Sequence, residues 1–400
     1  MPSIANRVNE IRPSPTIAMN VRAAELTRAG RDIVPFSLGE PDFHTAENIK
    51  AAGIAAINGN FTKYTAADGF GPLKKAVANK LLRENHAQYE PGQIVIGSGA
   101  KVILLAAIMC TVNPGDEVII PAPYWVTYPD HVQIAGGTPV FVASDAASGF
   151  KLTPEKLAAA LTRRTRALIF NSPTNPSGAI YTREEIQALG EVLKDYPDVW
   201  IITDELYEHL YYDEQRTVTF VEAMPKLAGQ IITINGFSKG YAMTGWRLGF
   251  AAGPQPVMKS IGDLLSTITG SPNSVAQAAA IEALEGDQSH IERNRKTFQE
   301  RRDFALQRLA QIPGLKAIKP AGTFYVLVDC AGWIGRVTRG GRVLTSDVAV
   351  VEALLEEADV ATVPGEVFGA GPFIRMSIAL GHETIGKGMD RIADFAERLK

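Results

Sequence analysis

Hydrophobic residues follow two alternating patterns along much of the chain. From residue 93 onward, short β-branched apolar runs are followed by longer segments with apolar residues at helical spacing. The runs predict strands at 93–96, 117–120, 139–142, 167–170, 199–203, 230–234 and 248–252. The segments between them predict helices at 102–110, 128–135, 154–161 and 183–194. Strands that alternate with helices predict a mostly parallel, doubly wound α/β sheet.

The two ends of the chain predict further elements. Ahead of the alternating region we expect helices at 16–29, 47–58 and 71–84 and a strand at 33–38. Behind it, a long helical region covers about 255–310. The remaining segments predict strands at 323–329, 360–363 and 373–379 and helices at 347–357 and from 382. We therefore expect a large domain at 45–290. A smaller α+β domain would comprise 291–400 and part of an N-terminal arm at 1–44.

Composition and charge exclude several classes of protein. The 400 residues exceed one domain of about 150 residues, and 46% hydrophobic with 21% charged residues is typical of a globular protein. A net charge of −3 gives no reason to expect nucleic acid or an anionic membrane as a partner. The longest apolar run, 102–110, is too short to span a membrane. We expect a cytoplasmic protein without a metal site, and Cys110 and Cys330 as buried free thiols.

Candidate chemistry lies in the loops that follow the predicted strands, because ligands bind beyond the carboxyl ends of strands in open α/β sheets. Lys239 lies in the loop between the strands at 230–234 and 248–252. A lysine there either extends to solvent or forms a Schiff base. The small residues from Gly97 to Lys101 open a helix and could bind a phosphate through backbone N–H groups. Many tight turns are equally rich in glycine.

Three further loop residues each allow two interpretations. Asp204 ends an apolar strand and either caps a helix at 205–210 or pairs with a cation such as a protonated ring nitrogen. Tyr207, three residues later, would lie on the same helical face. Trp125 is a packing residue or a flat ring beside a flat cofactor. Asn175 belongs to an ordinary turn or donates to a phenolate. Taken together with the lysine and the small-residue loop, these groups match the chemistry of pyridoxal 5′-phosphate.

The chain resembles the fold-type-I, class I aminotransferases over essentially its whole length, and within them the bacterial aspartate aminotransferase branch. The segments that carry the resemblance are Gly39-Glu40-Pro41-Asp42-Phe43, Asn175-Pro176-Ser177-Gly178, Asp204-Glu205-Leu206-Tyr207, and Ser238-Lys239 with Met243-Thr244-Gly245-Trp246-Arg247. The resemblance implies a large domain with a mostly parallel seven-stranded sheet flanked by helices. It also implies a smaller α+β domain and pyridoxal 5′-phosphate as cofactor.

The resemblance also implies a role for each residue toward the cofactor. Lys239 forms the Schiff base and moves a proton at the substrate. Asp204 pairs with the pyridine nitrogen, Trp125 stacks on the ring, and Asn175 and Tyr207 bind its phenolic oxygen. The implied residues around the phosphate are Gly99, Ala100, Lys101, Ser238, Arg247 and, from the neighbouring subunit, Tyr64. The last of these implies a homodimer with shared active sites. Many relatives carry a serine three residues before the lysine, where this chain has Gly236.

For the substrate, the resemblance implies that Arg375 grips the α-carboxylate bidentately. Gly39, Trp125 and Asn175 are implied as further contacts. Lys101 is either a ligand of a distal carboxylate or a solvated lysine, and Arg12 either a second distal contact or a surface charge. The implied activity is ping-pong transamination of L-aspartate and 2-oxoglutarate to oxaloacetate and L-glutamate.

Three alternatives to this activity remain. The protein could transaminate prephenate or aromatic amino acids, or it could be a lyase of the same fold. A non-catalytic regulator is disfavoured because such chains usually append a DNA-binding domain, and the arm before residue 45 is too short to form one.

Overall fold

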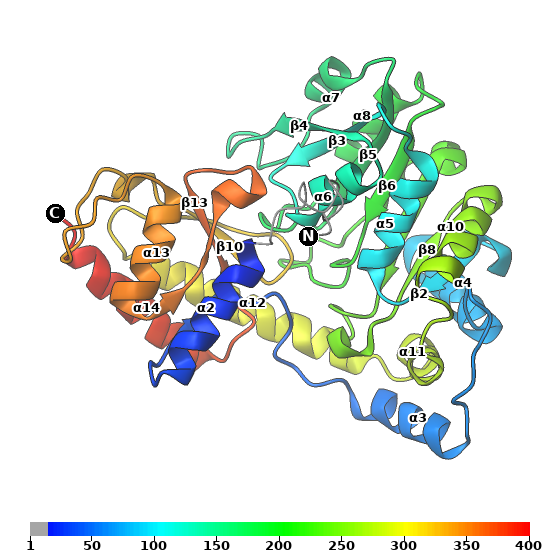
Figure 1. Cartoon of the computed structure of the whole chain (residues 1–400), viewed down its shortest axis with the longest axis horizontal. Coiled ribbons are helices and arrows are strands. Elements are labelled where there is room, and N and C mark those ends of the chain that lie inside the picture. The colour runs from blue at the N-terminus through cyan, green and yellow to red at the C-terminus, as the bar shows by residue number, and fades with distance from the viewer. Residues whose placement is uncertain (1–14) are drawn as a thin grey trace, which may run out of the picture.

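The computed structural model describes residues 15–400, with side chains from Ala18 onward. A seven-stranded sheet with helices on both faces forms the larger part of the molecule (Figure 1). A four-stranded antiparallel sheet with its own helices forms the smaller part, on the left of the same view. None of the helices within residues 15–400 is long and apolar enough to cross a membrane.

The large sheet confirms the predicted doubly wound architecture. Its strands are β2 (Ile94–Gly97), β3 (Glu117–Ala122), β4 (Thr138–Ala143), β5 (Thr165–Asn171), β6 (Trp200–Asp204), β7 (Ile231–Gly236) and β8 (Gly249–Ala252). They lie in the order β2-β8-β7-β6-β5-β3-β4. Neighbouring strands from β7 to β4 are parallel, and β8 is antiparallel to both β7 and β2. The seven strands fall at the predicted positions, with ends shifted by one or two residues.

Each face of this sheet packs against its own set of helices, because successive side chains of a strand point to opposite faces. Val118 and Ile120 of β3 belong to one hydrophobic cluster, and Ile119 between them belongs to another. The first cluster includes α5 (Ala100–Thr111), α6 (Thr127–Ile134) and α10 (Gln255–Ile268). The second includes α4 (Gly71–Asn85), α7 (Pro154–Ala160), α8 (Arg183–Leu193), α9 (Phe220–Ala223) and α11 (Ser274–Glu285), and α3 (Glu47–Asn58) packs on α11.

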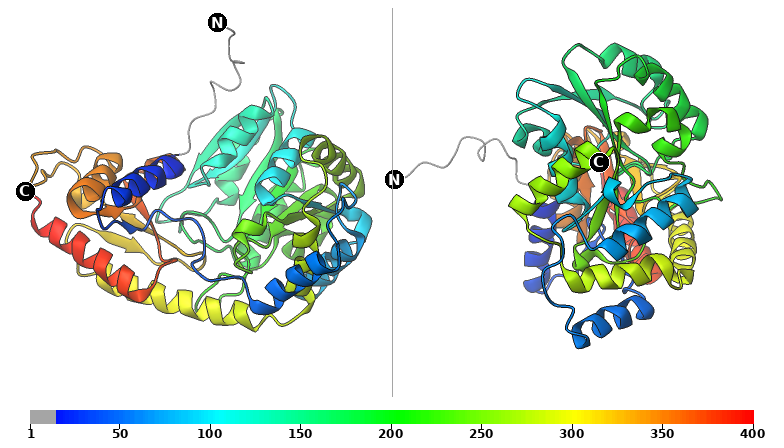
Figure 2. Two further views of the ribbon diagram at one scale, coloured as in Figure 1. Left: turned by 60° about the horizontal axis from the view of Figure 1, so that its bottom comes forward. Right: turned by 90° about the vertical axis from the view of Figure 1, so that its right-hand side faces the viewer.

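The smaller part has a separate hydrophobic cluster. Its sheet has the order β12-β13-β10-β9, from β9 (Lys316–Ile318), β10 (Tyr325–Asp329), β12 (Val363–Pro364) and β13 (Phe373–Ser377). Its helices are α13 (Asp347–Ala358) and α14 (His382–Glu397). The N-terminal segment joins this part through α2 (Pro15–Arg28) and β1 (Val34–Pro35), which pairs with β11 (Val360–Ala361). The long helix α12 (Ser289–Leu309) runs beneath both parts (Figure 2).

Several predicted elements differ from the structure. The helical region at 255–310 is divided into α10, α11 and α12, with Gly270 in a left-handed conformation (φ +70°) after the first and the Asn273 side chain capping the second. The strand predicted at 33–38 is reduced to the two residues of β1. The strand predicted at 360–363 is divided between β11, which pairs with β1, and β12, which belongs to the four-stranded sheet. Residues 206–209 form a turn, so the interpretation of Asp204 as the cap of a helix at 205–210 was wrong. Cys330 is buried as predicted, whereas Cys110 is only partly buried.

Candidate active site

A cavity of about 480 Å³ lies where β5, β6 and β7 end. The smaller part of the molecule and the segment before α3 close its other side. Most of the predicted site residues line this one cavity: Gly39, Ala100, Lys101, Trp125, Asn175, Asp204, Tyr207, Ser238, Lys239, Arg247 and Arg375. Residues that are far apart in the sequence therefore meet at the edge of the sheet at which parallel strands place ligands.

Lys239 follows β7 in a tight loop and its side chain enters the cavity. Its Nζ donates a hydrogen bond of 2.6 Å to the carbonyl oxygen of Gly39 and lies 5.7 Å from the centroid of the Phe324 ring. Burial lowers the pKa of Lys239 to about 8, an effect that the charge of Glu40 partly opposes. A lysine with this pKa supplies a neutral, nucleophilic amine near physiological pH.

Asp204 ends β6 with its carboxylate buried at the floor of the cavity. Oδ2 accepts a hydrogen bond of 2.7 Å from the Tyr128 hydroxyl, and Oδ1 accepts one of 3.2 Å from the backbone N–H of Leu206. Burial raises the pKa of Asp204, whereas these two hydrogen bonds and the charge of Lys239 lower it. Such a carboxylate is suited to pair with a cationic group of a ligand, as the second interpretation of Asp204 requires.

Two further polar side chains that line the cavity are those of Asn175 and Tyr207. β5 ends ahead of Pro173 and Pro176, because proline has no N–H to donate to a neighbouring strand. The backbone N–H of Asn175 donates a hydrogen bond of 2.9 Å to Asn171 Oδ1. The Tyr207 hydroxyl lies 3.4 Å from that of Tyr325. An asparagine amide and a phenol at this place can both donate to an oxygen of a bound ring.

The first turn of α5 forms a cradle that only small residues permit. Gly99 has a φ of +102°, and a Cβ there would lie 2.7 Å from Arg247 Nη2. A Cβ on Gly249 would lie 2.6 Å from the backbone nitrogen of Ala100. Backbone N–H groups at a helix start and a nearby guanidinium fit a phosphate. At Gly236 a Cβ would come within 3.1 Å of the Leu248 carbonyl oxygen, so β8 packs tightly on that position.

Arg375 lies on β13 and is only 2% exposed. Its guanidinium is held between the Tyr325 and Phe368 rings, with its central carbon 4.2 Å and 4.9 Å from their centroids. Nη1 donates to Asn175 Oδ1 at 3.1 Å and Nη2 to the Ser37 carbonyl at 3.3 Å. Within residues 15–400 no carboxylate forms an ion pair with it. A buried guanidinium without a carboxylate is costly, and it fits a ligand that brings one.

Lys101 stands at the cavity mouth in the first turn of α5. Its Nζ lies 5.0 Å from the centroid of the Trp125 ring. Partial burial and the charge of Arg247 lower the pKa of Lys101, and Asp130 opposes them. The lysine therefore adds a second positive charge to the wall of the cavity.

Comparison with known proteins agrees with this geometry. The model of the family described as aminotransferase class I and II matches residues 31–392. The chain belongs to this family. It is 48% identical to an aspartate/prephenate aminotransferase of Cereibacter sphaeroides, over the full length of both chains. It is 45% identical to an aspartate aminotransferase of Rhizobium meliloti, over 99% of this chain and 96% of that one.

Solved structures give the same result. A crystal structure of an aspartate aminotransferase from Rhizobium meliloti has a TM-score of 0.97, at 44% identity and full coverage of both chains. A Thermus thermophilus aspartate aminotransferase with maleate has a TM-score of 0.92, at 38% identity, over 99% of this chain and all of that one. The protein is thus an aminotransferase of fold type I, as its resemblance implied.

Two of the described residues that were predicted for the site of this aminotransferase, Gly99 and Tyr64, do not line the cavity. Tyr64 is 97% exposed and does not line it. Arg12 lies outside the described residues. The structure also adds residues that were not predicted, namely Asn20, Glu40, Tyr128, Thr244 and Tyr325. Only Tyr128 carried a signal, because it opens the helix predicted at 128–135 and follows Trp125 by three residues.

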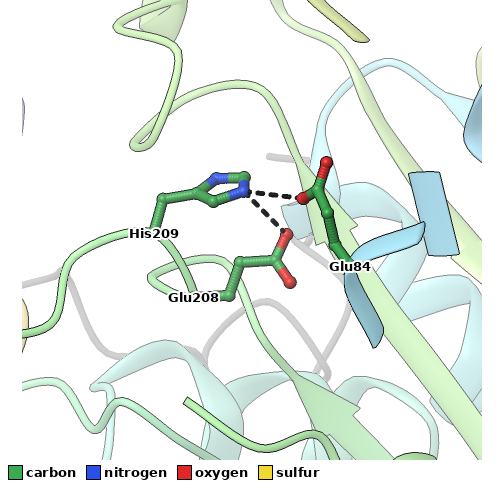
Figure 3. Close-up of side chains that lie close together, drawn as sticks. All are labelled: Glu84, Glu208 and His209. Atoms are coloured by element: carbon green, nitrogen blue, oxygen red, sulfur yellow. Dashed lines mark hydrogen bonds and ion pairs between the residues drawn. The ribbon is translucent and has the colours of Figure 1, made fainter. Parts of the chain in front are cut away.

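A second polar cluster supports the lysine loop of the aminotransferase from behind. His209 Nε2 lies 3.0 Å from Glu84 Oε2 and 3.7 Å from Glu208 Oε1 (Figure 3). The carboxylates could ligate a metal ion, but the ammonium of Lys80 already forms an ion pair with Glu208 and would have to be displaced. A Cβ on Gly240 would lie 2.5 Å from His209 Nδ1, so the imidazole packs on the backbone next to Lys239.

Proposed function

We propose that this aminotransferase uses pyridoxal 5′-phosphate to transfer an amino group between L-aspartate and 2-oxoglutarate. The observation that carries the proposal is the presence of Lys239 and Arg375 in one cavity. One is an amine with a pKa of about 8, and the other is a buried guanidinium that forms no ion pair within residues 15–400. The first suits covalent attachment of an aldehyde, and the second suits recognition of a carboxylate.

The side chains of the cavity fit this cofactor. The cradle at Gly99 and Ala100, with Arg247, would hold its phosphate, and Ser238 lies beside them. Asp204 would pair with its ring nitrogen, and Asn175 and Tyr207 would donate to its phenolic oxygen. When bound, the cofactor supplies an aldehyde and a ring that withdraws electrons from the substrate. Trp125 lines the same cavity, where it would cover one face of the ring.

The remaining residues would act directly on the amino acid. Arg375 would bind the α-carboxylate through two parallel hydrogen bonds, and its position between two rings limits its movement. Asn175 accepts a hydrogen bond from Arg375 and would therefore fix the position of the guanidinium relative to the cofactor. The backbone of Gly39 lines the same cavity and would be a further contact of the substrate. Lys239 would take up and return the proton at the substrate Cα, a task that its lowered pKa favours.

Lys101 supports the choice of a dicarboxylic substrate. Its ammonium is a second cation in the wall of the cavity that holds Arg375, so that each could bind one carboxylate. The Thermus thermophilus relative was solved with maleate, a dicarboxylate. The Cereibacter sphaeroides relative is named for both aspartate and prephenate, and prephenate also carries two carboxylates, so prephenate is the second candidate substrate.

Steady-state rates with purified protein test the proposal. The amino donors are aspartate, phenylalanine and arginine with 2-oxoglutarate as acceptor, and prephenate is offered as acceptor with aspartate. We expect the highest kcat/KM for the pairs of dicarboxylates and loss of all activity in Lys239→Ala. Dominant activity on phenylalanine or arginine would refute the dicarboxylate assignment. Release of pyruvate and ammonia without any oxo acid would instead identify a lyase.

We also propose a homodimer in which Tyr64 reaches the phosphate site of the neighbouring subunit. Its support is the 97% exposure of the Tyr64 ring and the exposed Ile54 and Ile57 on the nearby helix α3. Mixing inactive Lys239→Ala and Tyr64→Ala subunits tests it. If Tyr64 acts across the interface, each mixed dimer regains one intact site and activity returns. If each subunit used its own Tyr64, mixing would restore nothing.

Two other expectations stay predictions. The domain limits at 45 and 290 are supported by the separate hydrophobic clusters of the two parts and by the pairing of β1 with β11, which ties the N-terminal arm to the C-terminal part. Cytoplasmic location is the expectation from composition.

A further inference from the structure

Tyr128 is the only side chain within the described part of the chain that donates a hydrogen bond to the Asp204 carboxylate. The tyrosine is 2% exposed and Asp204 8%, so neither group is solvated by bulk water. The two lie 76 residues apart in the chain, on α6 and at the end of β6. Both line the cavity that contains Lys239. The bond therefore joins the acid at the cavity floor to a separate helix.

The local structure of α6 fixes the Tyr128 hydroxyl in place. The backbone N–H of Tyr128 donates a hydrogen bond of 3.0 Å to the Trp125 carbonyl oxygen. Its ring meets the Trp125 ring edge to face, with centroids 5.5 Å apart and an interplanar angle of 88°. The turn that leads into α6 thus carries both the flat ring of the cavity wall and the donor to Asp204. Burial, together with Asp204, raises the pKa of Tyr128 well above its usual value, so the hydroxyl keeps its proton and donates.

The hydrogen bond matters because Asp204 is buried. Burial favours the neutral acid, and the groups that oppose it are the Tyr128 hydroxyl, the Leu206 N–H and the charge of Lys239. The Lys239 charge is not constant, because its own pKa is about 8. Tyr207 is the other titratable group nearby, and burial raises its pKa well above 10, which leaves it uncharged. Tyr128 is therefore the one side chain that holds the carboxylate whether or not the lysine is protonated.

We propose that Tyr128 is a positioning residue that orients Asp204 and keeps it ionised toward the ring nitrogen of the cofactor. The inference rests on the proposed function, since it assigns Asp204 to that nitrogen. It adds a residue that acts through Asp204 and does not touch the substrate. Loss of the hydroxyl would leave Asp204 with one backbone donor, free to turn and more readily protonated.

Tyr128→Phe removes the hydroxyl and keeps the ring contact with Trp125. We expect the dissociation constant of pyridoxal 5′-phosphate, measured by equilibrium dialysis, to rise on the order of tenfold or more, as for lost hydrogen bonds to charged groups. The ratio of variant to parent dissociation constants should grow as the pH falls from about 8 to about 6, because Asp204 then becomes protonated in the variant first. Tyr212→Phe is the matched control, since it deletes another buried hydroxyl that donates to the Thr323 carbonyl outside the cavity.

A double-mutant cycle with Asp204→Asn separates this role from a purely structural one. If Tyr128 acts through Asp204, Tyr128→Phe in the Asp204→Asn background changes the dissociation constant by less than about twofold. An equal change in both backgrounds, or no change in the parent, would overturn the inference. If Asp204→Asn and Lys239→Ala also left cofactor binding unchanged, the proposed function itself would fail, which is a distinguishable outcome.

Discussion

The pH dependence of the Lys239 amine is the sharpest test of the chemistry assigned to the cavity. Burial lowers its pKa from 10.5 to about 8. At pH 7 about one molecule in ten then carries a neutral amine, against about one in 3,000 for an unperturbed lysine. At equal access, Lys239 should therefore react with electrophiles roughly 300-fold faster than a lysine with the ordinary pKa of 10.5. Burial of the amine would reduce this rate by limiting the access of the reagent.

Competitive labelling measures this difference. Protein freed of cofactor is exposed to a small amine-reactive reagent at a series of pH values, and each lysine is quantified by peptide mass spectrometry. The Lys239 signal should rise tenfold per pH unit and level off near pH 8. Lys194 serves as the internal reference, because its hydrogen bond with Glu191 and the charge of that residue raise its pKa. A Lys239 midpoint at or above that of Lys194 would refute the argument from burial.

The same shift has a consequence for stability. Between about pH 8 and 10.5 the unfolded chain binds a proton that the folded chain has lost, so the free energy of unfolding rises with pH in that window. Below pH 8 both states carry the charge, and the folded state bears a penalty of about 3 kcal/mol. Lys239→Met should therefore have a higher free energy of unfolding than the cofactor-free parent at pH 7. The expected gain is this penalty minus the stabilisation that the hydrogen bond to Gly39 provides in the parent. The gain should vanish above about pH 10.5 in chemical denaturation.

Three further predictions concern the cradle at Gly99, Lys101 and the polar cluster around His209. Gly99→Ala places a Cβ 2.7 Å from Arg247 at a φ of +102° and should weaken cofactor binding in dialysis by tenfold or more, whereas Gly229→Ala, in open space, should not. Lys101→Gln should raise the KM for aspartate about fivefold and leave the KM for phenylalanine within about twofold. An equal rise in both would contradict a role of Lys101 at the distal carboxylate. Burial raises the pKa of Glu84, but the hydrogen bond from His209 and the charge of Lys80 outweigh burial and hold this pKa at about 2. Lowering the pH from about 4.5 to 2 should therefore reduce the free energy of unfolding of the parent protein through this group. Glu84→Gln should not show this loss.

The fold followed from local patterns wherever one pattern held over a whole element. Buried parallel strands read as continuous apolar runs, which is why β5 and β7 were found. The helical region at 255–310 was read as continuous because the breaks around Gly270 and Asp287 span only a few residues. The sequence alone did not distinguish a turn after Asp204 from the start of a helix, since the same residue types cap helices and close turns.

The site was predictable where chemistry-bearing residues stand at strand ends, and less so where contacts come from tertiary structure. Asn175, Asp204 and Lys239 lie at or just beyond the ends of strands of one sheet, so their convergence follows from topology. Tyr325 enters the cavity because β10 pairs with β13 and its residue Leu327 lies opposite Arg375. That register depends on the folded sheet and left no trace in the sequence around Tyr325.

The distribution of charge in the cavity links the cofactor to the choice of substrate. Arg247 stands beside the cradle at Gly99, where a phosphate would compensate it. Arg375 and Lys101 remain: within residues 15–400 no carboxylate acts on Arg375, and Asp130 is the one that acts on Lys101. A neutral amino acid would compensate only Arg375, whereas a dicarboxylate compensates both. Under the proposed function, Lys101 is thus the described residue on which this discrimination would rest. Since single exposed charge pairs contribute at most about 1 kcal/mol, the preference for aspartate should be roughly fivefold when Lys101 acts alone.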